Sequence, residues 1–325
     1  MVNRRADALK TEQPGRKSLV AIGNFDGVHR GHRAVIEAAL SEARAADLYP
    51  LVLTFDPHPA VVLGRSVRPP LTMLDRKIDL IERLGDELRV VVEPFTLELS
   101  RLEPEQFARE FLVELLGAKV VIVGENFRFG HQRAGDLTSL MTLGKELGFD
   151  AHASSLSGDA LGPYSSTRVR AALAAGDLPA VYGVLGRPHS LSGLVVHGAQ
   201  RGRTIGVPTA NLAGVGEALP PYGVYAVLVD RLTEGGASIA LGAGVANIGL
   251  RPTVSGGFSV EVHLWDYAGD LYDSTLRVHL VAHLREERKF SGLDELKAQI
   301  QSDIEQGRAA LADARPDPLA RGAWR

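Results

Sequence analysis

The chain has 325 residues, no cysteine and a formal net charge of −3 at pH 7. This length suits two domains better than a single core, and the lack of cysteine excludes disulfides and thiol catalysis. The slightly negative charge argues against a large nucleic-acid or anionic-membrane footprint. No apolar run reaches about 18 residues, so no membrane span is predicted. We therefore expect a cytoplasmic protein without nucleic-acid or membrane partners.

Both ends of the chain are predicted to lie outside the folded core. Residues 1–17 are polar, and residues 314–325 contain two prolines without a periodic pattern. Terminal segments of this kind are poorly ordered unless other parts of the chain tie them down. We expect a disordered tail over 1–17 and a loose tail over 314–325.

From residue 19 to about residue 186, short apolar runs alternate with helical patterns. Helical spacing follows residue 32 and recurs over 74–81 and over 107–115, where Pro104 suits a first turn. This alternation predicts an α/β domain with a doubly wound parallel sheet. The predicted strands are 19–22, 51–55, 88–92, 119–123 and, more weakly, 151–154.

Two histidines, His29 and His32, stand where the first predicted strand gives way to the first helix. Backbone N–H groups at a helix N-terminus have no intrahelical partner and attract anions. Glycines at 23, 27 and 31 let the backbone turn sharply and let a ligand approach closely. A metal or a plain polar surface also suits an H-x-x-H pair, although a structural zinc site needs further ligands. We expect a phosphate here, while metal binding stays open.

Three polar loops follow the first, second and fourth predicted strands, over 23–32, 56–59 and 124–135. Because ligands of parallel sheets bind beyond the carboxyl ends of the strands, we expect these loops to converge on one cleft. The third loop is also compatible with a glycine-flanked turn whose aromatic side chains pack inward.

A hydroxyl-rich segment, residues 165–170, precedes an alanine-rich helical run. Hydroxyls at a helix start cap free N–H groups, whereas Arg168 and Arg170 in the first turn oppose the helix dipole. This placement of positive charge favours an anionic partner. A plain hydroxyl cap with two solvated arginines is the alternative.

After Gly186 the period changes to alternating, valine-rich runs separated by turn residues. Five or six strands without crossover helices predict an antiparallel β-barrel or sandwich, closed to protect its edges, and a helical pattern from Leu293 to Ile304 predicts a C-terminal helix. We expect the domain boundary near 185–188. The predicted strands are 190–196, 223–229, 238–248, 259–265 and 275–283.

Two segments of the second half carry candidate chemistry. The glycine- and arginine-rich loop from Gly198 ends in Thr209 and Asn211, which offer the oxygen ligands that Mg²⁺ prefers. A flexible basic loop is the alternative. Glu261 lies between Val260 and Val262, so on a strand its side chain points to the opposite face. A solvated surface glutamate is the alternative there.

The string Gly-Asn-Phe-Asp-Gly-Val-His-x-Gly-His over residues 23–32 resembles the bifunctional bacterial FAD synthetases, which belong to the H-x-G-H nucleotidylyltransferases. Segments 54–59, 124–130 and 165–170 resemble further motifs of that family, in the same order. Segments 208–211, 221–226, 247–253 and 260–264 resemble riboflavin kinase motifs. The resemblance covers roughly residues 19–305. Val207 and Asn126 depart from it, since phenylalanine and aspartate are common there.

The resemblance implies two ATP-dependent reactions. The second domain, residues 187–313, would phosphorylate riboflavin to FMN with release of ADP. The first domain, residues 18–186, would transfer an adenylyl group from ATP to FMN, giving FAD and pyrophosphate. The resemblance implies Mg²⁺ as the metal that accompanies ATP. The sequence is also compatible with a homo-oligomer.

The resemblance also implies roles for single residues. His29 and His32 would be catalytic in adenylyl transfer, Glu261 would be the general base of the kinase, and Thr209 and Asn211 would hold Mg²⁺. The implied nucleotide-binding residues are Gly23, Phe25, Asp26, Gly31, Ser166, Thr167, Arg168, Arg170, Gly198, Arg201 and Gly202. The implied flavin-binding residues are Phe55, Pro57, Asn126, Phe127, Arg128, Arg285, Phe290 and Leu293.

Two other functions compete with this interpretation. A nucleotidylyltransferase for another phosphate or phosphonate, with an accessory barrel, explains the first half but leaves segment 208–211 and Glu261 without a role. A flavin-binding sensor without catalysis predicts flavin binding without turnover, and it fits poorly with the presence of His29, His32 and Glu261. Incubation with riboflavin, ATP and Mg²⁺ discriminates all three.

Overall fold

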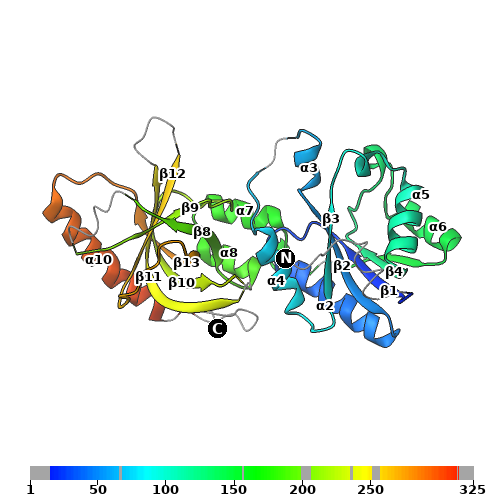
Figure 1. The fold of residues 1–325 in the computed structure, drawn as a ribbon, viewed down its shortest axis with the longest axis horizontal. Coiled ribbons are helices and arrows are strands. Elements are labelled where there is room, and N and C mark those ends of the chain that lie inside the picture. The colour runs from blue at the N-terminus through cyan, green and yellow to red at the C-terminus, as the bar shows by residue number, and fades with distance from the viewer. Residues whose placement is uncertain are drawn as a thin grey trace. The chain divides into compact units, whose positions relative to one another are not determined.

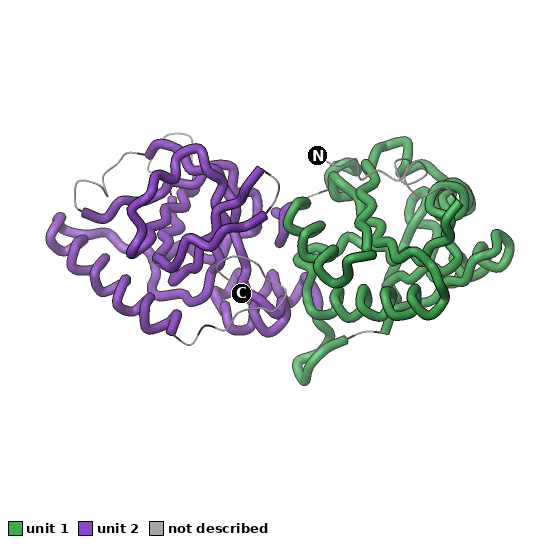
Figure 2. Tube along the Cα trace, turned by 60° about the horizontal axis from the view of Figure 1, so that its bottom comes forward, with its two compact units in different colours: residues 1–68, 74–164 green, residues 69–73, 165–325 purple. Residues whose placement is uncertain are grey.

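The computed structural model describes residues 15–65, 68–155, 157–198, 206–234, 237–250, 257–312 and 314. The chain forms two compact units, which Figure 2 colours separately. The first unit contains residues 1–68 and 74–164, and the second contains residues 69–73 and 165–325. The predicted tails fall largely outside the described residues.

The first unit is built on a five-stranded parallel sheet with the spatial order β3-β2-β1-β4-β5. Figure 1 labels β1, β2, β3 and β4 of this sheet. Every residue of the central strand β1 is buried, as expected for a parallel sheet covered on both faces. The predicted doubly wound sheet is therefore confirmed. The strands are β1 (Ser18–Ile22), β2 (Tyr49–Asp56), β3 (Arg89–Pro94), β4 (Ala118–Val123) and β5 (Asp150–Ala153).

Helices connect these strands. Pro104 opens α5 as predicted, but the segment that follows it winds as a π-helix, in which the Leu116 N–H donates to the Phe111 carbonyl. The α-helices are α2 (Arg30–Ala45), α3 (Pro59–Val62), α4 (Leu74–Glu82), α5 (Pro104–Gln106) and α6 (Leu137–Leu147). The remaining elements are η1 (Leu99–Arg101), the π-helix η2 (Phe107–Leu115), η3 (His131–Arg133), β6 (Gly158–Asp159) and β7 (Gly162–Pro163).

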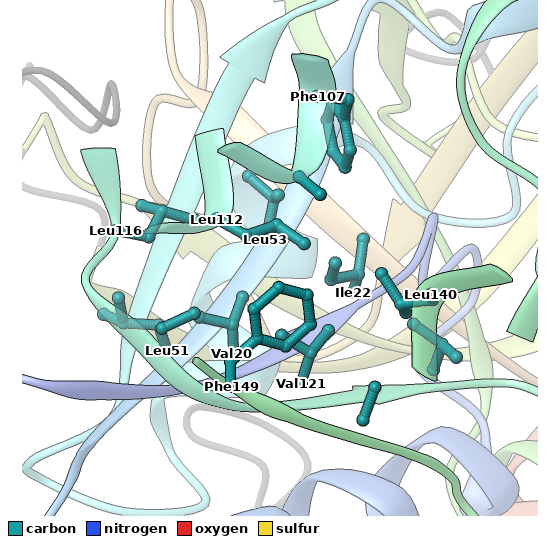
Figure 3. Packing of buried hydrophobic residues seen from close by; sticks show 14 of the residues in the cluster. Val20, Ile22, Leu51, Leu53, Phe107, Leu112, Leu116, Val121, Leu140 and Phe149 are labelled. Atoms are coloured by element: carbon teal, nitrogen blue, oxygen red, sulfur yellow. The ribbon is translucent and has the colours of Figure 1, made fainter. Parts of the chain in front are cut away.

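Two apolar clusters cover the two faces of this sheet, because successive strand residues point to opposite sides. One contains Val20 and Leu53 together with Leu112 and Phe149 (Figure 3). The other contains Leu19 and Val52 together with α2 residues. The apolar face predicted for α2 is the one that is buried, through Ile36, Ala39, Leu40 and Ala43.

The second unit contains a closed six-stranded antiparallel barrel with the order β10-β11-β12-β9-β8-β13. The predicted barrel and C-terminal helix are confirmed. The strands are β8 (His189–Val196), β9 (Ala210–Ala213), β10 (Gly223–Leu232), β11 (Ser238–Leu250), β12 (Phe258–Leu264) and β13 (Thr275–Glu286). The helices are α7 (Ser166–Ala174), α8 (Leu178–Leu185) and α10 (Leu293–Ala312).

The division between the units falls after Tyr164 and not at residue 186, where the sequence pattern changes. Packing explains the difference, because α7 packs on α8 and α8 contacts β8 and β13. Residues 69–73 join the second unit as well, where the Ala218 N–H donates to the Pro70 carbonyl oxygen at 2.8 Å. The change in the spacing of apolar residues shows where the helices end along the chain. Tertiary packing determines which of the two units α7 and α8 belong to.

Candidate active sites

The loop between β1 and α2 is fixed by buried apolar side chains. Phe25 and Val28 have left-handed backbones, with φ of 47° and 40°, although neither is a glycine. Their side chains are only 4% and 1% exposed and join the cluster that contains Ile36. Burial offsets the cost of this backbone conformation, which is unfavourable for a β-branched residue such as Val28. The chain therefore enters α2 in a defined geometry.

His29 is the N-cap residue of α2. Its buried Nδ1 accepts a hydrogen bond from the His32 backbone N–H at 3.2 Å. Since an accepting Nδ1 carries no hydrogen, the hydrogen of the ring is on Nε2, and His29 is a neutral donor in this geometry. The predicted position at the strand-to-helix junction is confirmed.

The imidazole of His32 stacks on that of His29, with ring centroids 3.6 Å apart and an interplanar angle of 20°. The edge of the Phe25 ring contacts His32 at a centroid distance of 5.2 Å. Two like charges at such a separation disfavour each other. The pair thus presents N–H donors and at most one full positive charge to an anion.

Gly23 and Gly31 leave room for the packing of this loop's own side chains. A Cβ at Gly31 would lie 3.1 Å from both His29 Nδ1 and the Tyr164 carbonyl oxygen. A Cβ at Gly23 would lie 3.0 Å from the Phe25 ring. Both contacts are tighter than ordinary van der Waals contact, so these glycines let the histidine pair and Phe25 take their positions.

Lys77 on α4 is a charged residue near this edge that the sequence pattern did not reveal. Burial lowers the pKa of the Lys77 ammonium group below its usual value. The carboxylates of Asp26, after β1, and Asp56, at the end of β2, oppose this shift only in part. The helical pattern of α4 gave no signal beyond placing Lys77 next to the buried Ile78.

The predicted flavin residues of the first unit lie at the carboxyl end of β2 and in the loop after β4. The ring of Phe55 meets that of Phe95 edge-on at 5.8 Å, and Phe127 stacks on the buried Phe129 at 5.5 Å. Phe55 and Phe127 both pack against the same core cluster, so these aromatic side chains turn inward. Pro57 lies beyond the end of β2, and Asn126 and Arg128 are exposed. Their flavin contacts stay predictions.

The hydroxyl-rich segment forms the start of α7 as predicted. The Ser165 hydroxyl accepts from the Arg168 backbone N–H at 3.2 Å and caps the helix. The Arg170 guanidinium donates to the Pro69 carbonyl oxygen at 2.8 Å. The predicted nucleotide residues here, Ser166, Thr167, Arg168 and Arg170, belong to the second unit, whereas the histidine pair belongs to the first.

In the barrel, three polar residues lie in one row across neighbouring strands. Glu261 on β12 is directly opposite Asn211 on β9 and opposite Asn247 on β11. Residues paired in this way project from the same face of a sheet. The predicted base and one predicted metal ligand are thus neighbours. Asn247, the first residue of motif segment 247–253, is a polar neighbour to which the sequence pattern gave no role.

A cavity of about 540 Å³ lies beside β9 and β12, which line it through Asn211 on β9 and through Val262 and Leu264 on β12. Thr209 and Asn211 line it together with Pro208, Tyr267 and Tyr272, whereas Glu261 is not among the described lining residues.

Gly198 also lines this cavity, and a Cβ there would come within 2.5 Å of Asn211 Cγ, so this glycine makes room for the Asn211 amide. The predicted nucleotide residues Arg201 and Gly202 lie outside the described residues.

The predicted flavin residues near α10 have structural contacts of their own. Arg285 donates through Nε and Nη2 to the buried Asp303 carboxylate, at 2.9 and 2.8 Å, and so ties α10 to the barrel. The Phe290 ring lies 5.6 Å from the Arg285 guanidinium, and Leu293 is 63% exposed. These contacts neither require nor test a flavin.

Among the described residues, no group of three or more His, Asp or Glu side chains is arranged to hold a metal ion. No described helix is long and apolar enough to cross a membrane. The oxygen donors Thr209 and Asn211 line the cavity as predicted metal-ligand candidates, and the Asp270 carboxylate lines it as well.

Comparison with known proteins covers both units. Residues 11–168 match the family model for FAD synthetase, and residues 185–311 match the model for riboflavin kinase. The bifunctional riboflavin kinase/FMN adenylyltransferase of Escherichia coli (strain K12) is 41% identical over 295 residues, which cover 90% of this chain and 92% of the relative. The protein of the same name from Bacillus subtilis (strain 168) is 37% identical over 307 residues, with 91% and 92% covered.

A solved structure described as a macrolide-efflux protein from Streptococcus pneumoniae has a TM-score of 0.77 and 28% identity, covering 90% of this chain and 94% of that one. It therefore shares the two-unit fold over nearly its whole length. With both family models matched in the order of the two units, the chain belongs to the bifunctional riboflavin kinase/FMN adenylyltransferases.

Proposed function

We propose that the row of Asn211 and Glu261, beside the cavity, carries the riboflavin kinase step of this enzyme. The observation that supports this assignment is their direct pairing across β9 and β12. The volume of about 540 Å³ is within the range of small-molecule sites. The assignment would fail if variants of these residues left FMN formation unchanged.

In the kinase step, Glu261 would accept a hydrogen bond, and then the proton, from the terminal ribityl hydroxyl of riboflavin. The hydroxyl oxygen bonds to the γ-phosphorus of ATP while the bond to the ADP oxygen breaks. Glu261 is half-buried between two neutral amides, Asn211 and Asn247, so these neighbours add no charge at the base. Positioning and electrostatics do most of the work in phosphoryl transfer.

Mg²⁺ fits the donors present at the cavity. The Thr209 hydroxyl and the Asn211 amide oxygen are hard oxygen ligands, and Mg²⁺ commonly completes its shell with phosphates and water. When bound, Mg²⁺ neutralises charge on the phosphates. Gly198 would leave room for Asn211 to turn its oxygen to the metal, and Arg201 and Gly202 would contact the nucleotide.

In the adenylyl-transfer step, the phosphate of FMN is already a nucleophile, so no general base is needed. Its oxygen attacks the α-phosphorus of ATP and pyrophosphate leaves. His29 Nε2–H, His32 and the backbone N–H groups at the start of α2 would stabilise charge on the α-phosphate. Gly23, Phe25, Asp26 and Gly31 would shape the site around ATP. Ser166, Thr167, Arg168 and Arg170 would hold its phosphates.

Flavin binding would use two sets of residues. Phe55, Pro57, Asn126, Phe127 and Arg128 would hold FMN for adenylyl transfer. Arg285, Phe290 and Leu293 would hold riboflavin in the kinase. We assign the functional domains to residues 18–186 and 187–313, and the use of ATP in both steps supports a cytoplasmic location.

Incubations of the parent chain test the two proposed activities and the need for Mg²⁺. The purified chain with riboflavin, ATP and Mg²⁺ should form FMN first and FAD second, as measured by chromatography, and omission of Mg²⁺ should stop FMN formation. Supplied FMN should be adenylylated without riboflavin. Flavin binding without either product would contradict the catalytic roles.

A further inference from the structure

His263 connects the strand that carries Glu261 to the loop that precedes β9. Its ring Nδ1 lies 2.8 Å from the Pro208 carbonyl oxygen. Because a carbonyl oxygen only accepts hydrogen bonds, Nδ1 carries the hydrogen and donates it. This contact joins two segments that are 55 positions apart in the sequence.

The register of the barrel explains why a side chain makes this link. Backbone pairing between β12 and β9 runs from Val260↔Leu212 to Val262↔Ala210. Pro208 and Thr209 immediately precede β9 in the sequence and belong to no strand. Proline has no N–H with which to continue the pairing. The imidazole of His263 therefore restrains the chain at the point where the backbone ladder ends.

His263 also lies on the same face of β12 as the proposed base, because residues two apart on a strand point the same way. Glu261 pairs with Asn211, and both Pro208 and Thr209 line the cavity together with Asn211. One strand thus carries the proposed base and, at the next position on the same face, the group that restrains the ligand loop.

We infer that His263 is a positioning residue of the kinase: by holding Pro208, it keeps Thr209 and Asn211 in the geometry that a Mg²⁺–nucleotide complex requires. This inference rests on the proposed metal-ligand role of Thr209 and Asn211. The hydrogen bond needs only Nδ1–H, so His263 contributes by fixing the loop and does not touch the reacting atoms.

Two substitutions in the full chain separate the hydrogen bond from the bulk of the ring. His263→Phe keeps a ring but removes the donor. His263→Asn keeps a donor, because the Asn amide nitrogen is as many bonds from the backbone as His Nδ1. The adenylyl transfer of supplied FMN, measured on the same preparations, reports whether the chain remains folded.

In His263→Phe, we expect the KM for Mg²⁺ and the calorimetric Kd for Mg²⁺–ADP to rise about tenfold, on the order of one lost hydrogen bond. The kcat should change less than these binding constants. His263→Asn should restore both constants to near the parent values. Unchanged constants in His263→Phe, or no rescue by His263→Asn, would overturn the inference. If His263→Phe fails to fold, raised constants in His263→Asn still contradict the inference, and the ring tautomer of His263 then decides whether the contact with Pro208 exists.

A measurement without nucleotide tests the contact itself. In ¹⁵N-histidine-labelled protein, His263 should show the tautomer with hydrogen on Nδ1, assigned by the signal that His263→Asn removes. A ring with hydrogen only on Nε2 would contradict the contact. Thr209→Ala and Asn211→Ala then separate the two ideas. If both leave Mg²⁺–ADP binding unchanged, the metal-ligand proposal fails, whereas weakened binding there with parent-like constants in His263→Phe contradicts only the positioning role.

Discussion

Glu261 and Asn211 stand directly opposite each other on the antiparallel strands β12 and β9. The Cβ atoms of such a pair are about 4.5–5.5 Å apart and lie on one face of the sheet. A base and a metal ligand at this separation can act on the two partners of one phosphoryl transfer. If Glu261 and Asn211 have their proposed roles, adjacent strands of the barrel would bring together the attacking hydroxyl and the phosphate that it attacks.

Glu261→Ala should therefore stop riboflavin phosphorylation, because the neighbours of Glu261 in that row, Asn211 and Asn247, are amides that cannot replace the base. Supplied FMN should still be adenylylated, since the histidine pair belongs to the other unit. Separate assays with riboflavin and with FMN measure the two steps. The exposed Glu305→Ala on α10 is the control and should leave both activities unchanged. Loss of both activities in Glu261→Ala, with an intact circular dichroism spectrum, would argue for coupled sites.

His32→Ala should lower adenylyl transfer about a hundredfold or more, on the order of the loss of one donor to a developing anion. FMN formation should not change. The cap of α2 is the ring of His29, which accepts from the His32 backbone N–H, and His32→Ala keeps this N–H. FMN-dependent pyrophosphate release measures the step. Near-normal FAD production by this variant would refute the role of His32.

His29 combines a capping role with a proposed catalytic one, and two substitutions separate them. His29→Asn keeps a side chain that caps helices well, whereas His29→Ala removes the acceptor for the His32 N–H and should cost about 1 kcal/mol of stability. Both variants lose the Nε2–H donor, so both should lose adenylyl transfer. Urea unfolding and the FMN assay measure the two effects. Parent-like activity in His29→Asn would show that the cap alone matters.

The sequence pattern predicted the sheet, the barrel and the histidine junction because each depends on local periodicity. Alternation of short apolar runs with helical spacing indicates a parallel sheet, and β1, β2 and β4 fall where this pattern places them. The start of α2 at Arg30 follows in the same way from glycines and a polar cap before an amphipathic run. Local signals therefore position the chemistry at the carboxyl edge of the sheet.

Long-range contacts had no such signal. The pairing of Arg285 with Asp303 depends on how α10 docks on the barrel, which no period encodes. The proximity of Lys77 to Asp26 and Asp56 depends on the packing of α4 over the sheet. The assignment of α7 and α8 to the second unit is a packing result of the same kind. Each of these features joins two segments that are distant in the sequence. The local pattern of either segment predicts its own helix or strand but not its contact with the other segment.

Glu217 is a buried carboxyl group that should make stability depend on pH. It is 4% exposed, and among the described residues its Oε2 has no hydrogen-bond partner. Burial raises its pKa above the usual 4.5, against weaker opposing hydrogen bonds such as those from Ser192. The fold therefore favours the protonated form. The stability that this preference contributes is fully present below about pH 4.5 and is lost as the pH rises through the raised pKa.

Glu217→Gln, which stays uncharged, should gain stability relative to the parent as the pH rises above 4.5 and should show no gain below it. Thermal unfolding followed by tryptophan fluorescence measures this in a Trp324→Phe background, so that Trp265 alone reports the barrel. The exposed Glu234→Gln is the matched control and should show no pH-dependent difference. A stability difference that does not change with pH would contradict the titration of Glu217.

The ion pair of Arg285 and Asp303 allows a test of whether Arg285 binds flavin or holds α10. The Asp303 side chain is 3% exposed, and Arg285 Nη1 also donates to the Glu286 carbonyl oxygen at 3.0 Å, so the geometry favours a structural role.

Arg285→Met leaves the Asp303 carboxylate buried without its cation and should cost about 3 kcal/mol of barrel stability. Replacing both partners by apolar residues, Arg285→Met with Asp303→Leu, should recover most of that loss, because the buried charge is gone. The riboflavin KM should recover with it, as measured by FMN formation at saturating ATP. A riboflavin KM that stays more than about tenfold raised in the stable double variant, the effect of a lost charged hydrogen bond, would instead place Arg285 in contact with the flavin.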